Sequence, residues 1–188
     1  MPQPSVPSVD LARWAREAWD NGPNTDKRTP WTHYFNDFLA RRVAPGVTAF
    51  GCGPGHNGQY LVDHCWSAPW TCMRDYRGLD LIAEFEWHGT RSAIEEDLIK
   101  LADVRAQARL FVGNLWGADW KSVAQCIADD AATMLAKHRF AREDRIVLAI
   151  GPKGQTREQQ EGLLIWEVTA SGATPLRGTT DEGASAQS

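Results

Sequence analysis

The stretch Leu79–His88, LDLIAEFEWH, decides the fold class because its residues alternate between two kinds of side chain. The odd positions are all apolar, namely Leu79, Leu81, Ala83, Phe85 and Trp87. The even positions carry Asp80, Ile82, Glu84, Glu86 and His88. Successive side chains of a β-strand point to opposite faces, so a period of two predicts a strand here. We expect its odd face in a hydrophobic core and its acidic face beside a site or solvent.

Apolar spacing on both sides of this strand predicts the remaining elements. Before it we expect helices over 10–20, with Asp10 as N-cap, and over 31–43, then strands over 47–50 and 59–67. After it we expect a helix from a capping box at Ser92-Ala-Ile-Glu95 to about Arg109, a strand over 110–115, a helix over 122–137, and strands over 146–150 and 163–170. Short early connections favour antiparallel strands, and the later strand–helix–strand units favour parallel ones.

These elements predict an α/β fold, with a mixed central β-sheet flanked by helices on both faces. The core order is αβββαβ, followed by a further helix and two strands. With 188 residues, 43% of them hydrophobic, the chain has the size of a single domain. We expect that domain over 1–170 and a flexible C-terminal tail over 171–188, where small and polar residues dominate.

Charge and cysteine content limit the classes of partner. The net charge of −4 gives no general attraction for phosphate. Nucleic-acid binding would therefore rely on local basic patches, for which the candidates are Arg41-Arg42, Arg74 with Arg77, and Arg139 with Arg142 and Arg145. The absence of a signal-peptide pattern and of a membrane-length apolar run favours a cytoplasmic protein with no membrane partner. The four cysteines form no CxxC pair and suit a reducing compartment, while the oligomeric state stays open.

The glycine-rich stretch Gly51–Gly55, GCGPG, permits two interpretations. It could be the loop of an S-adenosylmethionine site in a methyltransferase, with Asp80 of the GLD string as the acid for the ribose. Such a loop leads directly into a helix, whereas β-prone residues, HNGQYLVDHCW, follow this one. The sequence therefore favours a turn between two strands, with the methyltransferase as an alternative.

Glu84 and Glu86 share one strand face, which places their carboxylates about 6–7 Å apart. Two like charges at that distance disfavour joint ionisation unless a cation lies between them. Mg²⁺ suits this role, because it binds one or two protein carboxylates together with waters and phosphate oxygens. Asp63, on the preceding strand, is the candidate third acid.

The arrangement of Asp63 in VDHCW, Glu84 and Glu86 in AEFEW, and the following IEEDLIKLADVRAQARLFV resembles the PD-(D/E)xK, or restriction-endonuclease-like, nuclease superfamily over roughly 31–116. That superfamily has an αβββαβ core. The resemblance implies that Asp63 and Glu84 bind Mg²⁺ or Mn²⁺, with Glu86 in the ExE form that replaces the usual lysine. It also implies that Lys100, on the following helix, supplies that lysine. The implied reaction is metal-assisted hydrolysis of a phosphodiester.

Other roles for these residues stay open. Glu86 at the lysine position allows a non-catalytic interaction module on a degenerate nuclease-like core. Lys100 could instead pair with Glu96, and the acidic strand face could be solvated. A cluster of zinc-ligand types, Cys52, His56, His64, Cys65 and Cys72, matches no closed Cys/His motif. His88 borders the acidic face, and we expect most of the nine tryptophans in the core.

Overall fold

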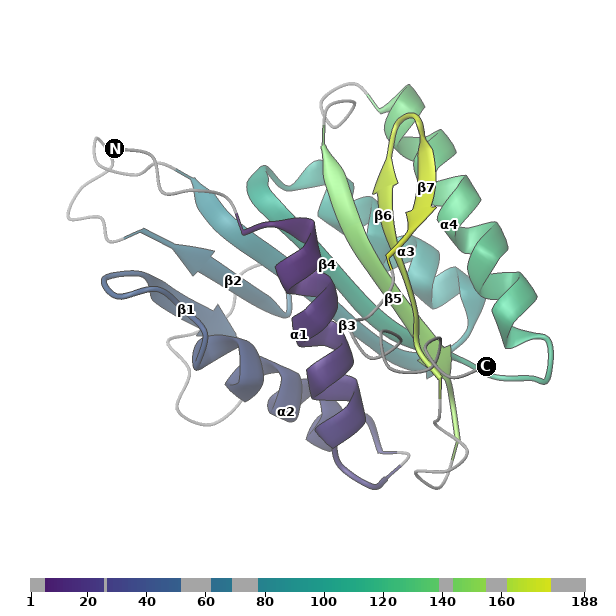
Figure 1. The fold of residues 1–188 in the computed structure, drawn as a ribbon, viewed down its shortest axis with the longest axis horizontal. Helices are drawn as coiled ribbons and strands as arrows, with labels where there is room; N and C mark the ends of the chain where they lie inside the picture. The colour runs from purple at the N-terminus through teal and green to yellow at the C-terminus, as the bar shows by residue number, and fades with distance from the viewer. Residues whose placement is uncertain are drawn as a thin grey trace, which may run out of the picture.

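The computed structural model describes residues 6–25, 27–51, 62–68, 78–138, 144–154 and 162–176. Within these residues seven strands form one sheet whose spatial order follows the chain, from β1 to β7 (Figure 1). The strands are β1 (Thr48–Gly51), β2 (His64–Ser67), β3 (Leu79–Gly89), β4 (Ala106–Leu115), β5 (Arg145–Pro152), β6 (Leu164–Thr169) and β7 (Gly172–Pro175). β3, β4 and β5 run parallel, and antiparallel pairs extend the sheet at both edges.

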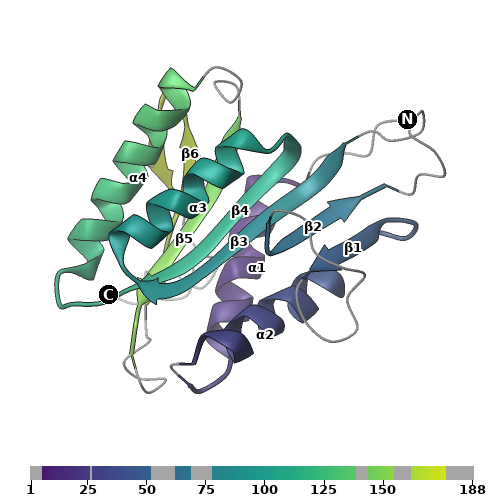
Figure 2. The same cartoon turned by 180° about the vertical axis from the view of Figure 1, so that it is seen from behind.

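Helices cover both faces of the sheet. α1 (Ser8–Asn21) and α2 (Arg28–Ala40) pack on one face, and α3 (Arg91–Asp103) and α4 (Trp120–Lys137) pack on the other, as the view from behind shows (Figure 2). Each pair of helices closes its own hydrophobic core against the sheet. The predicted α/β fold, a mixed sheet between helical layers, is confirmed.

The alternation of β3 assigns its two faces to the two cores. Leu81, Ala83, Phe85 and Trp87 lie in the core under α1 and α2, whereas Ile82 lies in the core under α3. The first of these cores is aromatic: the Trp87 ring lies 5.3 Å from Trp31 and 5.6 Å from Phe35, between centroids. The acidic face of β3 consequently lies beneath α3, because the even side chains share the side of Ile82.

The end of α3 differs from the prediction. The helix ends at Asp103 and β4 begins at Ala106, although the sequence predicted a helix to about Arg109. The buried guanidinium of Arg109 donates to the carbonyl oxygens of Leu101, Val104 and Ala106 at 2.8–3.1 Å. The bonds to Leu101 and Val104 satisfy carbonyls at the end of the helix, which lack partners inside it, and the bond to Ala106 reaches the start of β4. A charged residue inside an apolar strand was therefore misread as helical.

The predicted helix starts also differ. α1 begins at Ser8 after Pro7, so Asp10 lies in its first turn and is not the N-cap. α3 begins after Thr90, and no side-chain capping bond forms there, so the predicted capping box at Ser92 is wrong. α2 spans Arg28–Ala40, so it begins before the predicted start at 31 and ends before the predicted end at 43. In each case the N-terminus is set by extended backbone at the preceding residue.

The second strand is shorter than predicted. β2 begins at His64, and Val62 and Asp63 form a bend before it. The carboxylate Oδ2 of Asp63 accepts the backbone N–H of Phe85 at 2.9 Å, so a side chain takes a position on β3 that a strand carbonyl would otherwise occupy. Residues 59–61 lie outside the described part of the chain.

Two further expectations concern the glycine stretch and the tail. Gly51 ends β1, the other residues of GCGPG lie outside the described residues, and His64–Ser67 form a strand antiparallel to β1. In the segment expected as a tail, residues 172–175 form β7 on β6, while 177–188 lie outside the description. Within the described ranges the structure contains no helix that is both long enough and apolar enough to cross a membrane.

Candidate functional site

The acidic face of β3 becomes a buried site because α3 lies over it. Glu84 is 2% exposed and pairs in register with Phe111 of β4, in the middle of the sheet. A solvated strand face, which the alternation alone permitted, is therefore excluded for Glu84. A buried carboxylate needs a compensating charge or must take up a proton.

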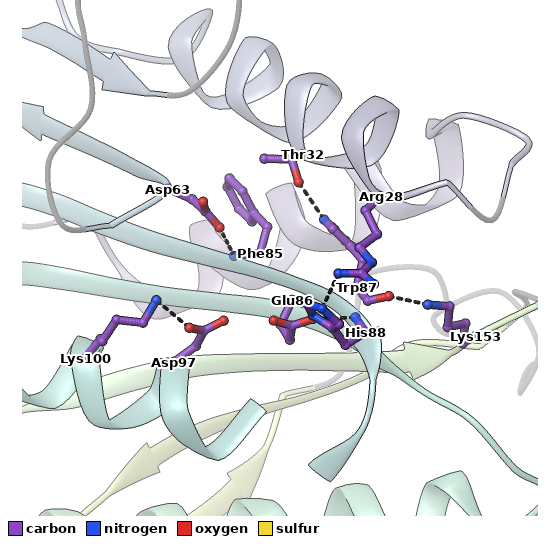
Figure 3. Close-up of polar contacts among 10 residues, drawn as sticks. All are labelled: Arg28, Thr32, Asp63, Phe85, Glu86, Trp87, His88, Asp97, Lys100 and Lys153. Carbon is purple, nitrogen blue, oxygen red and sulfur yellow. Dashed lines mark hydrogen bonds and ion pairs between the residues drawn. The ribbon is translucent and has the colours of Figure 1, made fainter. Parts of the chain in front are cut away.

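Lys100 of α3 supplies that charge. Its Nζ lies 3.1 Å from Oε1 of Glu84 and 2.5 Å from Oδ1 of Asp97, one turn earlier on the same helix. Figure 3 shows the ammonium and the Asp97 carboxylate side by side under β3. The contact with Glu84 has the distance of an ion pair but not the direction of a hydrogen bond, so this buried Oε1 keeps no hydrogen-bond partner. Lys100 therefore faces the sheet, as the resemblance implies.

The electrostatics couple four acids in one cluster. Burial raises the pKa of Glu84 to about 8, with contributions from the charges of Asp63 and Asp97, and Lys100 opposes the rise. Burial also raises the pKa of Asp97, and the charges of Glu86 and Asp63 act in the same direction. Burial lowers the pKa of Lys100, but its contacts with Asp97 and Glu84 outweigh this and raise it overall. The lysine is therefore protonated throughout the range in which the carboxylates titrate.

Asp63 is held at the edge of this cluster by the backbone of β3. Its bond to Phe85 N–H fixes the carboxylate directly beside the strand position that follows Glu84. The influence of its charge on the pKa of both Glu84 and Asp97 places it within electrostatic reach of these two acids. The contact of Lys100 with Glu84, together with the electrostatic influence of Asp63 on Glu84, places these three residues in one charged cluster.

Glu86 faces the other end of the site. Its side chain is 12% exposed, and Oε1 contacts both the backbone N–H and, at 2.5 Å, the ring Nδ1 of His88. The other ring nitrogen of His88 contacts the guanidinium of Arg28, at the start of α2 (Figure 3). Glu86 therefore contacts His88, which in turn contacts Arg28, whereas Glu84 faces a lysine.

The cluster suits a divalent cation in its donor chemistry. Mg²⁺ and Mn²⁺ prefer oxygen ligands, and Mg²⁺ commonly uses only one or two protein carboxylates with waters. Glu84 Oε1 is a buried carboxylate oxygen that already lies 3.1 Å from a cation, the Lys100 ammonium, so its surroundings suit positive charge. Across the described ranges no set of three or more His, Cys, Asp or Glu side chains has the arrangement of a metal site. Glu84 and Asp97 share the Lys100 ammonium as their positively charged partner.

Asp97 is the site residue that the sequence reasoning missed. The signal was present: Asp97 and Lys100 are three apart, so they lie on the same face of a helix, and Lys100 was already a candidate. Asp97 lies in the acidic run Glu95-Glu96-Asp97, a pattern typical of a solvated helix face. Its 9% exposure shows that it points to the sheet.

The other candidates do not join this site. His64 is buried, its Nδ1 contacts Asn36 Oδ1 at 2.7 Å, and its Nε2 accepts Trp66 Nε1–H at 2.9 Å. Both ring nitrogens are thus engaged by protein groups, which does not favour a zinc ligand. Burial raises the pKa of the Cys65 thiol to about 12, so this cysteine is not a ready thiolate. The remaining zinc candidates, Cys52, His56 and Cys72, lie outside the described residues.

The basic patches are only partly described. Arg42 pairs with Glu17 at 2.7 Å and Arg145 with Glu167 at 3.3 Å, so these two arginines have local acidic partners. Four further arginines of these patches lie outside the described residues, namely Arg74, Arg77, Arg139 and Arg142.

Comparisons with protein-family profiles, with curated proteins and with solved structures gave no match, so the function must be inferred from the geometry of the site.

Proposed function

We propose that this chain is a divalent-metal-dependent nuclease of the PD-(D/E)xK type that hydrolyses phosphodiester bonds. The observation that carries the proposal is the meeting of Lys100, from the helix after the ExE strand, with Glu84 of that strand, beside the charge of Asp63. This is the combination of residues that the resemblance implies for a member with its lysine on the helix. The order α2-β1-β2-β3-α3-β4 supports the proposal, because it follows the αβββαβ core.

The energetics of Glu84 also support a functional role. Burying a carboxylate next to Asp63 and Asp97 costs stability, and apolar residues would fill the same space without that cost. Strongly shifted pKa values gather at sites that do chemistry. A cluster with no function would be expected to lose its buried charges, whereas a metal site needs them.

The residues have separate roles in this proposal. Asp63 and Glu84 would hold the Mg²⁺ or Mn²⁺ ion, with Asp97 and Glu86 as the neighbouring carboxylates. The ion supplies Lewis acidity and lowers the pKa of a bound water. Lys100 Nζ, protonated throughout, offsets the negative charge of the acids and orients a water or phosphate oxygen by hydrogen bonding. Glu86, held by His88, is the carboxylate placed to accept a proton from the attacking water.

The test is cleavage of plasmid DNA and of labelled single-stranded DNA and RNA with Mg²⁺ or Mn²⁺, against samples with EDTA. We expect metal-dependent cleavage by the wild type and a loss of about 100-fold or more in Glu84→Gln and Lys100→Met. Glu96→Gln, on an exposed position of α3, is the matched control and should retain activity. Cleavage that survives both EDTA and Glu84→Gln would exclude the proposed site.

A non-catalytic interaction module is the second candidate. The specific observation in its favour is the Lys100 ammonium, which already compensates Glu84 and Asp97 without a metal. This candidate predicts neither cleavage nor a metal effect on thermal stability.

The methyltransferase alternative depends on residues 52–55, which lie outside the described residues, and it gains no support from the part of the chain that the structure describes. For the nuclease we propose a cytoplasmic location, in keeping with cysteines that form no CxxC pair.

A further inference from the structure

The strongest unexplained surface feature is Trp116, directly after β4. Its exposed fraction is 51%, and among the tryptophans that the structure describes it is the exposed one. The others follow the expectation that tryptophan fills the core. A half-exposed indole offers a flat apolar face on which another ring can stack.

The ring is fixed in place by its neighbours. The backbone N–H of Trp116 donates to the carbonyl of Gly89 at 3.1 Å, and Lys153 Nζ lies 5.1 Å from the ring centroid. A Cβ at Gly89 would come within 2.5 Å of Trp116 Cδ1 and 2.9 Å of Lys153 Cδ. Gly89 also has a φ of +80°, which suits glycine. Glycine at this position thus lets the indole and the lysine pack against the end of β3.

This corner adjoins the proposed catalytic site. Gly89 follows Glu86 by three residues on β3, which corresponds to roughly 10 Å at about 3.3 Å per residue. Lys153 Nζ donates to the carbonyl of Trp87, between the two. Three steps of a stacked nucleic-acid strand, at about 3.4 Å each, cover the same distance.

The charges around the corner suit phosphate. Arg28 contacts His88 from α2, and Lys153 covers the ring from the end of β5, so cations approach the end of β3 from two elements (Figure 3). An exposed ring combined with cations is how proteins bind single strands: bases stack on the ring and phosphates meet the charges. A regular duplex offers no free base face, so this geometry favours a strand with unpaired bases.

We propose that Trp116 and Lys153 form a stacking contact for an unpaired nucleotide, which places a single-stranded or locally melted nucleic acid beside Glu84 and Glu86. The inference rests on the proposed nuclease function, because it names the substrate class of the same site. Trp116 stacks on a base, and Lys153 contacts a neighbouring phosphate.

The experiment is fluorescence anisotropy of the full chain with a labelled single strand and with the matching duplex, without divalent metal so that no cleavage occurs. We expect the single strand to bind more tightly than the duplex. Trp116→Ala should weaken single-strand binding about tenfold, and Trp116→Phe should restore most of it. Lys153→Met should weaken binding and reduce its salt dependence by about one ion.

Ile99→Ala is the matched control, because Ile99 is a large apolar side chain with the same 51% exposed fraction, on α3. It should leave binding unchanged, and thermal melting of every variant should report intact folding. Equal binding by Trp116→Ala and wild type, a preference for duplex, or no binding by the wild type would each overturn the inference.

The same experiment separates this inference from the proposed function. If the wild type cleaves in Mg²⁺ and Trp116→Ala binds and cleaves equally well, the nuclease stands and the stacking contact fails. If Trp116-dependent binding occurs but no metal allows cleavage, the contact stands and the proposed reaction fails.

Discussion

At the scale of single residues, the main finding is that β3 buries a carboxylate which the hydrophobic core does not need. Glu84 has an exposed fraction similar to that of Phe85, the residue after it, but Glu84 carries an ionisable group. The free-energy cost of burying Glu84 is partly offset by Lys100, whose side chain remains 47% exposed. Water therefore reaches the lysine from one side, and we expect the cluster to open in that direction.

The first prediction concerns the pH dependence of stability. The pKa of Glu84 is raised to about 8 in the folded chain, whereas an unfolded glutamate titrates near about 4.3. Between these values the folded state binds more protons than the unfolded state, so the free energy of unfolding falls as pH rises. Glu84→Gln carries no such proton. Relative to that of the wild type, the free energy of unfolding of this variant should therefore rise by roughly 2 kcal/mol as the pH increases from about 5 to about 8.

Urea denaturation at the two pH values measures this difference, and Glu96→Gln serves as the exposed control. A Glu84→Gln variant whose stability relative to wild type is the same at both pH values would contradict the shifted pKa.

A second prediction follows for the lysine. Lys100→Met leaves Glu84 and Asp97 without their cation, so the chain should lose about 1–2 kcal/mol of unfolding free energy near pH 8, a value reduced by the exposure of the lysine. The loss should shrink near pH 5, because Glu84, with its pKa raised to about 8, then takes up a proton and needs no cation. Lys121→Met, on the exposed side of α4, should change stability by less than about 0.5 kcal/mol. Equal losses in the two variants would show that Lys100 is not part of a buried cluster.

At the scale of elements, the position of the site depends on where α3 ends and β4 begins. Arg109 joins the two by donating to three carbonyls between them, and its guanidinium lies 2.7 Å from the carboxylate of Asp144, at the start of β5. Burial lowers the pKa of Arg109, and the carboxylate of Asp144 opposes this by its charge and its hydrogen bond. Arg109 thus ties the last turn of α3, through the carbonyl of Leu101, to β4 and to the residue before β5.

The third prediction is that Arg109→Met destabilises the chain by about 3 kcal/mol, because Asp144 and the carbonyls lose a buried partner. Arg105→Met is the control: Arg105 is exposed between α3 and β4, so this change should leave the free energy of unfolding nearly unaltered. Chemical denaturation of the pair measures the difference. If Arg109→Met is no less stable than Arg105→Met, α3 is held by other contacts.

Most elements were predictable from periodicity, and the misses share a cause. The alternation in Leu79–His88 predicts a strand with one apolar face. The continuous apolar run at Ile146–Ile150 predicts a strand that is buried on both faces. The start of β4 was missed because a buried arginine interrupts that pattern. The shortened β2 was missed because the Asp63 carboxylate replaces a backbone partner of Phe85. Side chains that bond to the backbone leave no periodic trace in a sequence.

At the scale of the whole molecule, two helical layers determine what the acids can do. α1 and α2 bury the aromatic face of β3, and α3 covers the acidic one, with α4 beside it over β5, β6 and β7. The sequence could predict that Glu84 and Glu86 share one face of β3, since strand geometry places alternate side chains on the same side. It could not predict that Asp97 is buried, or the chain of contacts from Glu86 through His88 to Arg28, because these depend on how α2 and α3 dock on the sheet.

The fourth prediction concerns metal and stability together. A cation that binds the folded chain raises its melting temperature by mass action. We expect Mn²⁺ or Mg²⁺ to raise the melting temperature of wild type, more strongly near pH 8 than near pH 5, because protonated carboxyls bind metal poorly. The shift should vanish in Glu84→Gln and remain in Glu96→Gln. A shift that persists in Glu84→Gln would place the metal elsewhere.

The central claim is that the cluster at Glu84 and Lys100 performs metal-dependent hydrolysis, and cleavage of labelled single-stranded DNA and RNA tests it most directly. Wild type, Glu84→Gln, Lys100→Met and Glu96→Gln are compared in Mn²⁺, in Mg²⁺ and in EDTA. The account predicts metal-dependent cleavage by wild type and Glu96→Gln only. Folded wild-type protein that cleaves no nucleic acid under any of these conditions, or variants at Glu84 and Lys100 that cleave as well as wild type, would contradict it.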